Sequence, residues 1–299
     1  MEDRRVTVRI EIGHRHYLAY LLLPHPVKMA LLSRASRQRL DTINRAFNER
    51  IYSSDGATEY DRIHRYDEAE RQDYPVRGLV DERWAAGGYG RALELGAGSG
   101  YFTVMIARHA TSLLAVEPVP DMQTVLAERC RAAGLDHVRI VGATAADLPA
   151  HLGQASVDSA FILQSLHHFH RRGDVFRALG RVVRPVGRLF VVEPHHNLRR
   201  VARLLRKYLA QYRAPGFWRD ERNWATHDFL TRAELRALCR QGGFTDVRME
   251  GYWIPFSRRL IPDARRRFGW ERTAGRLPGV RHFAAVLSLT ARRRDDGHG

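Results

Sequence analysis

The chain has 299 residues, of which 44% are hydrophobic and 27% charged, and this composition is typical of a folded globular protein rather than a disordered one. The longest apolar stretch, residues 17–23, is too short to span a bilayer, and we expect no secretory signal because no apolar core follows the first residues. With only Cys130 and Cys239, neither a disulfide framework nor a metal cluster is expected, which predicts a reduced, cytoplasmic protein.

The charge balance is strongly basic. Lysine plus arginine total 49 against 33 acidic residues, a net charge of +16 that raises the possibility of a nucleic-acid or membrane-surface protein. Lys28 and Lys207 are the only lysines, however, and the remaining 47 basic residues are arginines spread along the chain. Such an arginine bias favours a compositional origin and a solvated surface over a dedicated basic patch.

The first 85 residues are predicted to form an extension without a recognisable chemical motif. Alternating apolar residues over 6–12 predict a half-buried strand, and residues 13–14 allow a turn into a second strand over 16–23. Helical sequence follows over 27–52, and charged helical sequence continues to about residue 84.

From residue 91 onward, short apolar runs alternate with helical segments, which predicts a parallel α/β sheet. We assign residues 86–197 to the first part of this core. Its predicted strands are 91–95, 113–117, 138–141, 157–164 and 188–193, and its predicted helices are 101–109, 122–133 and 175–183.

Residues 198–230 are predicted to be a helical insertion. Apolar and arginine side chains occupy opposite faces of its first helix, a pattern that favours a lid over the substrate and leaves peripheral membrane contact as the alternative. Its aromatic residues suit an apolar or aromatic substrate. The core resumes over 231–293 with a helix at 231–242 and strands near 246–253 and 282–292, before a tail at 294–299.

A glycine-rich turn follows the first core strand. Gly96, Gly98 and Gly100 occupy alternate positions, so that the backbone can turn sharply and a ligand can lie against bare main chain. The G-x-G-x-G spacing differs from the G-x-G-x-x-G fingerprint of dinucleotide-binding proteins, and this disfavours a dehydrogenase.

Glu117 ends the second predicted strand about twenty residues beyond these glycines. A carboxylate at this place can accept hydrogen bonds from both hydroxyls of an adenosine ribose. We expect the side chain to be partly exposed and little packed without ligand. Together, the turn and the acid predict a site for an adenosine-containing cofactor at the carboxyl ends of the strands.

These segments resemble the motifs of class I S-adenosylmethionine-dependent methyltransferases of the small-molecule type, in the order found in that family. The matching segments are residues 92–103, 116–122, 141–149, 156–169 and 179–194. The resemblance implies a Rossmann-like, doubly wound sheet of seven strands, mostly parallel with an antiparallel last strand, and S-adenosyl-L-methionine as the cofactor.

The resemblance also implies a set of cofactor-binding residues: Glu94, Gly96, Ala97, Gly98, Gly100, Glu117, Pro118, Met122, Thr144, Ala145 and Gln164. The chain departs from the family pattern at Thr144, where many relatives carry aspartate and where Asp147 or main chain could substitute. A second departure is Val186, which stands where a second glycine of the closing turn is expected.

Histidines follow the fourth and fifth predicted strands, where active sites of the family open. His167, His168 and His195 are therefore candidate general bases, which would assist methylation of an alcohol or phenol. A packing role remains the alternative for each.

The predicted function is methyl transfer by in-line displacement to an O- or N-nucleophile of a small molecule from secondary or lipid/quinone metabolism. The alternatives are a nucleic-acid methyltransferase and a non-catalytic cofactor-binding adaptor. Nucleic acid is disfavoured because the fourth strand exits as Leu-Gln-Ser-Leu (163–166), unlike the Asn/Asp-Pro-Pro-aromatic turn of amino-base methylases. The acceptor atom and the oligomeric state are not predicted.

Overall fold

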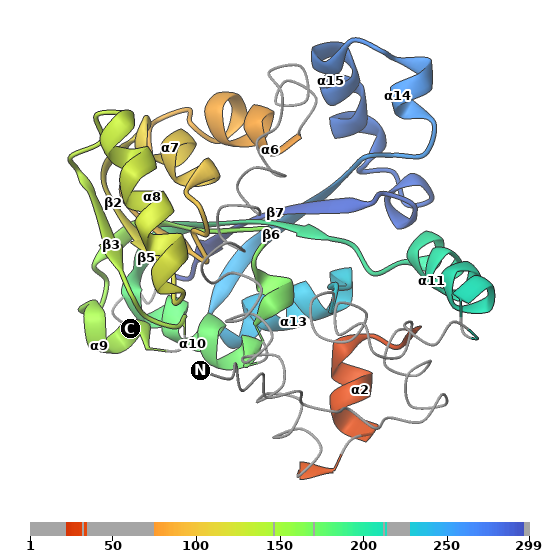
Figure 1. Ribbon diagram of the computed structural model, residues 1–299, viewed down its shortest axis with the longest axis horizontal. Helices are drawn as coiled ribbons and strands as arrows, with labels where there is room; N and C mark the ends of the chain where they lie inside the picture. Colours follow the sequence, from red (N-terminus) through yellow and green to blue (C-terminus); the bar gives the residue numbers. More distant parts are fainter. Residues whose placement is uncertain are drawn as a thin grey trace, which may run out of the picture.

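The computed structural model describes residues 22–31, 33–34, 75–145, 147–169, 171–211, 213 and 228–295. Its centre is a seven-stranded sheet with the order β3-β2-β1-β4-β5-β7-β6 (Figure 1). The strands are β1 Gly90–Leu95, β2 Ala110–Val116, β3 Val138–Val141, β4 Val157–Leu163, β5 Val183–Pro194, β6 Phe244–Tyr252 and β7 Val286–Arg293.

The strand directions confirm the predicted α/β fold. β1 to β5 pair in parallel, whereas β7 runs antiparallel to both β5 and β6. The last strand begins at Val286 rather than near residue 282, because residues 280–282 form a short 3-10 turn. β5 begins at Val183, earlier than expected, and its register against β4 shifts between residues 157 and 159 of that strand.

Helices cover both faces of the sheet (Figure 1). Alternate residues of β4 point to opposite sides: Ala160 and Ile162 contact one apolar cluster, and Phe161 and Leu163 contact the other. The first face is covered by α9 Leu148–His151, α10 Arg172–Val182 and α13 Arg232–Gln241, and the second by α6 Pro75–Arg77, a π-helical segment Gly78–Arg83 and α7 Tyr101–Ala107. α8 Pro120–Ala132 packs beside β2 and β3.

The sequence did not predict the helices α14 Ser257–Leu260 and α15 Ala264–Ala274. α15 is rich in arginine and has little apolar periodicity. It is fixed instead by tertiary contacts: the ring of Phe268 stacks on that of Tyr252 at 5.3 Å, and Glu271 accepts hydrogen bonds from the backbone N–H groups of Trp253 and Ile254.

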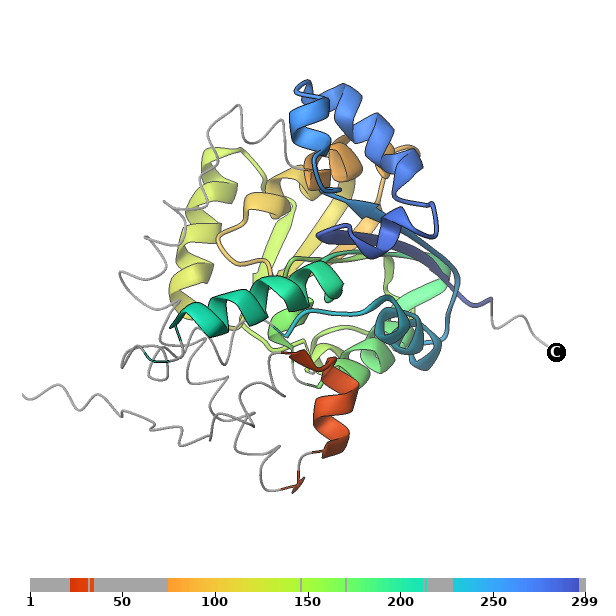
Figure 2. The same ribbon diagram turned by 90° about the vertical axis from the view of Figure 1, so that its right-hand side faces the viewer.

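Two helices lie at the end of the molecule where β5 leaves the sheet. α11 Leu198–Gln211 follows β5 directly and runs across the view in Figure 2, with α2 His25–Leu31 below it. The predicted N-terminal hairpin and residues 214–227 of the predicted insertion lie outside the described residues. Within the described ranges, no helix combines the length and apolar character needed to cross a membrane.

Candidate functional site

The turn between β1 and α7 depends on glycine at three positions. Gly96, Gly98 and Gly100 have φ values of 70°, 55° and 83°, a region that side-chain-bearing residues rarely adopt. A Cβ atom on Gly96 would lie 2.5 Å from Cβ of Ser165, whereas one on Gly98 would meet nothing within 4 Å. Gly98 therefore presents bare backbone to open space.

The carboxylate of Glu117 joins this turn to the segment after β2. Its Oε2 accepts a hydrogen bond from the Gly98 N–H at 2.9 Å, and its Oε1 accepts one from the Val119 N–H at 3.0 Å. The residue is only 6% exposed, and burial raises the pKa of the carboxyl. The expectation of a partly exposed, little-packed side chain was wrong, because the turn folds over the strand tip and donates to the carboxylate.

A cavity of about 160 Å³ lies at the carboxyl ends of β1, β2 and β4. Gln164, at its β4 side, adopts a left-handed conformation with φ 57° and donates its backbone N–H to the carbonyl of Val192 at 2.7 Å. The cavity is lined by Gly96, Gly98, Glu117, Pro118, Val119, Met122, Gln164, Ser165, His168 and Phe169.

Six of the predicted cofactor residues line this cavity, and the other five do not. Glu94 is buried behind the turn, where it accepts a hydrogen bond from Oγ1 of Thr103 at 2.6 Å, and burial raises its pKa to about 8. Ala97 packs in a small apolar cluster with Leu126. A Cβ atom on Gly100 would lie 2.5 Å from Cδ1 of the same leucine.

The two predicted residues after β3 also lie outside the cavity lining. Thr144 is exposed and donates its hydroxyl hydrogen bond to Oδ2 of Asp147. Ala145 is 9% exposed and packs in the core cluster that includes Leu148.

The three candidate bases occupy different surroundings. His167 is buried, and its Nδ1 lies 2.8 Å from Oε2 of Glu193, whose Oε1 accepts hydrogen bonds from the N–H groups of Ser165 and Leu166. Burial favours the uncharged form of each partner: it lowers the pKa of His167 to about 3, assisted by the charge of Arg172, and raises that of Glu193 to about 8. His167 lines neither of the cavities described in this section.

His168 lines the cavity beside Gln164, and its ring centre lies 4.1 Å from that of His167. His195 lies instead beyond the end of β5, with Nδ1 3.1 Å from the carbonyl oxygen of Ala284. Burial lowers the pKa of His195 to about 4, so its ring is uncharged at neutral pH. Nδ2 of Asn197 lies 3.2 Å from the same ring nitrogen and also donates to the Ala284 carbonyl at 2.7 Å, so an acceptor and a donor both face Nδ1.

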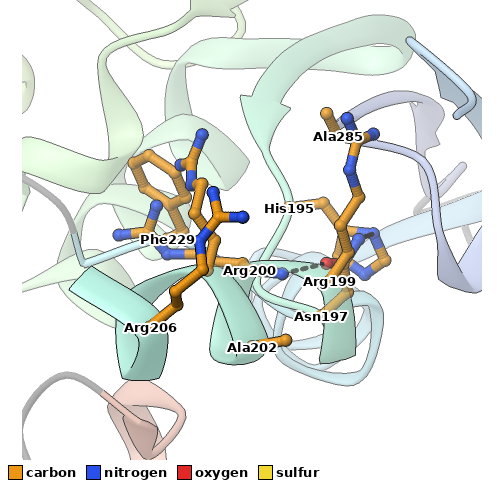
Figure 3. A pocket seen from close by; sticks show the side chains of 9 residues that line it. His195, Asn197, Arg199, Arg200, Ala202, Arg206, Phe229 and Ala285 are labelled. Atoms are coloured by element: carbon orange, nitrogen blue, oxygen red, sulfur yellow. Dashed lines mark hydrogen bonds between the residues drawn. The ribbon is translucent and has the colours of Figure 1, made fainter. Parts of the chain in front are cut away.

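His195 belongs to a second, larger cavity of about 440 Å³ (Figure 3). The sequence had assigned the arginines of α11 to the polar face of an amphipathic lid helix, without predicting a cavity beside them. The cavity is lined by His195, Asn197, Arg199, Arg200, Ala202, Arg203, Arg206, Phe229 and Ala285.

Sequence comparisons place the core among methyltransferases. A family model described as "Methyltransferase domain" matches residues 93–191. Uncharacterized methyltransferases of Mycobacterium tuberculosis and Mycobacterium bovis are 38% identical over 105 residues, which cover 34% of this chain and 39% of each relative. The chain thus matches well under half the length of these curated relatives.

Solved structures share the fold at low sequence identity. Phosphoethanolamine N-methyltransferase 2 of Haemonchus contortus, in complex with S-adenosyl-L-methionine, is 15% identical with a TM-score of 0.58, covering 84% of this chain and 60% of that one. A possible histamine N-methyltransferase of Thermotoga maritima is 19% identical with a TM-score of 0.50, covering 79% and 95%. The motif order and the family model agree that residues 93–191 match a methyltransferase domain, and the solved structures share the fold of this core.

Proposed function

We propose that this chain uses S-adenosyl-L-methionine to methylate an O- or N-nucleophile of a small molecule from secondary or lipid/quinone metabolism, in the cytoplasm. The observation that carries the proposal is the cradle formed by Glu117 and Gly98 at the carboxyl ends of β1 and β2. Ligands of parallel α/β sheets bind at this edge.

The residues that line the smaller cavity fit the cofactor. Each oxygen of Glu117 accepts one backbone hydrogen bond, and a carboxylate has about four acceptor positions, so two remain for the ribose hydroxyls. Pro118, Val119 and Met122 supply apolar surface for the adenine ring. The open space beside Gly98 is room that any side chain at this position would reduce.

When bound, the cofactor supplies a methyl group activated by a sulfonium. The residues of the chain then have to align the acceptor, exclude water and take a proton where the acceptor carries one. His168 and His195 are the proposed proton acceptors, because each lines a cavity. For His167 we infer a positioning role, since it lies buried against Glu193.

Ligand binding tests the proposal directly. Purified protein is expected to bind S-adenosylhomocysteine and to ignore NAD. A hundredfold excess of ligand over its Kd should raise the free energy of unfolding by about 2.7 kcal/mol. Stabilisation by NAD alone would contradict the proposal.

Tight, sequence-selective RNA binding at physiological salt would favour the nucleic-acid alternative, because binding through charge alone weakens steeply as salt rises. S-adenosylhomocysteine binding without methylation of any acceptor class would favour the adaptor.

A further inference from the structure

The larger cavity concentrates positive charge from one helix. Arg199, Arg203 and Arg206 are spaced four and three residues apart on α11, so they share one helix face, and Arg200 adds a fourth guanidinium from the next position. Figure 3 shows the labelled arginine side chains around the cavity, with His195 nearby. None of the described residues that line the cavity carries a carboxylate.

Arg200 is the buried member of this group. It is 7% exposed, and its guanidinium carbon lies 3.3 Å from the ring centre of Phe229. Burial and the charge of Arg203 lower the pKa of Arg200 to about 9, while Asp228 acts in the opposite direction. Asp228 is itself paired with Lys28 and with His25. Because Asp228 is shared with these two partners, it offsets the positive charge of the cavity only in part.

The basic cavity lies beside the candidate cofactor cavity at the same edge of the sheet. His168 lines the cofactor cavity and contacts His167, whose ring centre lies 5.6 Å from that of Phe229 in an edge-to-face arrangement. Phe229 in turn lines the basic cavity. One short series of ring contacts therefore connects the walls of the two cavities. The two cavities therefore lie on either side of this short series of packed rings.

We propose that this cavity binds a phosphate group of the methyl acceptor, an inference that rests on the proposed function because it assigns the acceptor class. A guanidinium binds two oxygens of a carboxylate or a phosphate through paired N–H donors. A carboxylate offers a single edge with two oxygens, whereas a terminal phosphate offers three oxygens and carries up to two negative charges. Four guanidiniums at one cavity therefore match a phosphate better than a carboxylate.

Phosphate binding can be measured without any methylation. We would titrate inorganic phosphate into the whole chain at constant ionic strength, comparing wild type with R203Q/R206Q and with the control R236Q/R240Q. Both pairs are exposed on helices and remove the same charge, but Arg236 and Arg240 lie on α13, outside the cavity lining. R203Q/R206Q should weaken phosphate binding by about tenfold or more, since it removes two of the four guanidiniums that line the cavity. The control should stay within about twofold.

Affinity for S-adenosylhomocysteine separates this inference from the proposed function. It should be unchanged in R203Q/R206Q, and thermal melts would verify that each variant is folded. Failure of the wild type to bind S-adenosylhomocysteine would contradict the proposed function, whereas the measured phosphate affinities would still decide whether the phosphate site exists. Equal phosphate affinity in wild type and R203Q/R206Q, or an equal loss in R236Q/R240Q, would overturn the phosphate site.

A soluble phosphate ester and a lipid headgroup present the same chemistry to the arginines. Glycerol 3-phosphate tests the first source, and phosphatidylcholine vesicles with and without phosphatidic acid test the second. Binding of either probe that is lost in R203Q/R206Q and kept in R236Q/R240Q supports the site and identifies the source. If R203Q/R206Q binds both probes as the control does, the site is refuted.

Discussion

At the scale of single residues, Glu117 has two roles, one in binding the ligand and one in holding the glycine turn, and the sequence alone indicated only the first. Its carboxylate faces the proposed cofactor cavity and also accepts the N–H groups of Gly98 and Val119. A change at this residue therefore acts on ligand affinity and on the unliganded fold together.

Glu117→Ala should lower the affinity for S-adenosylhomocysteine by one to three decades, because it removes two charge-assisted hydrogen bonds to the ribose. The unliganded protein should also lose about 1–3 kcal/mol, since the substitution leaves backbone donors without their acceptor. Calorimetric titration measures the first effect and denaturant unfolding the second. Unchanged affinity would show that the ribose binds elsewhere.

Glu94 offers a test of charge burial. Its carboxyl is fully buried, and its pKa rises from 4.5 to about 8 on folding. Because the folded-state pKa is the higher one, the carboxyl contributes fully to the free energy of unfolding below pH 4.5. This contribution is lost as the pH rises towards 8. Glu94→Gln cannot ionise and therefore does not lose stability as the pH rises, while its amide oxygen can still accept the hydrogen bond from the Thr103 hydroxyl.

The stability of Glu94→Gln relative to wild type should therefore increase with pH, by at most about 1.4 kcal/mol per unit between these limits. Urea unfolding of both unliganded proteins at about pH 5 and about pH 8 makes the comparison. A difference that does not change with pH would mean that the carboxyl ionises in the folded state as it does in the unfolded chain.

At the scale of elements, the glycines of the β1–α7 turn are required for different reasons. Gly98→Ala places a methyl group in open space beside the cofactor cavity, at a backbone cost of about 1–2 kcal/mol for a left-handed residue. Gly96→Ala adds a collision with Ser165 at 2.5 Å to a similar backbone cost. We expect Gly98→Ala to fold and to bind S-adenosylhomocysteine at least about tenfold more weakly.

Gly96→Ala should lose clearly more stability than Gly98→Ala, because Ser165 is buried and its hydroxyl donates to the carbonyl of Leu95. Thermal melts of the two variants, followed by titration with S-adenosylhomocysteine, distinguish these roles. Equal melting temperatures would mean that the β4 exit yields to the added methyl group.

At the scale of the whole molecule, a buried cluster of charged side chains connects α2 to α10 and to the segment before α13. Asp228 pairs with Lys28 and His25 of α2, and Arg172 of α10 lies 3.8 Å away. Burial alone would favour the neutral acid, yet the hydrogen bond from His25 and the charges of Lys28 and Arg172 hold the pKa of Asp228 well below its usual range.

Asp228→Asn should cost about 3–5 kcal/mol, because it leaves buried cations without their counter-charge. The control Asp174→Asn removes two ion pairs at the start of α10, with the exposed side chains of Arg171 and Arg177, and should cost less than about 1 kcal/mol. Adding Lys28→Met to Asp228→Asn should recover part of the loss. Urea unfolding measures all three variants, and equal losses in the two single variants would show that the cluster contributes no more than a surface pair.

The sequence by itself determined the core of this protein. Short apolar runs separated by helical segments predicted all seven strands. The signal is strongest at the central strand β4, which is buried on both faces and therefore nearly continuous in apolar residues, and weaker at the partly exposed strands β3 and β6. The glycine turn and Glu117 could be located for the same local reason: a sharp turn requires glycine, and the acid follows its strand directly. The methyltransferase class was readable from these local features.

Only the tertiary structure decided how the remaining polar groups are used. His167 and His168 are neighbours of one type, yet packing buries one against Glu193 and places the other on a cavity wall. The arginines of α11 read locally as a solvated face. They line a cavity because His195, Phe229 and Ala285, far apart in the chain, meet them where β5, β7 and the segment before α13 converge. Periodicity reports which face of a helix is polar, whereas the neighbours of that face depend on long-range packing.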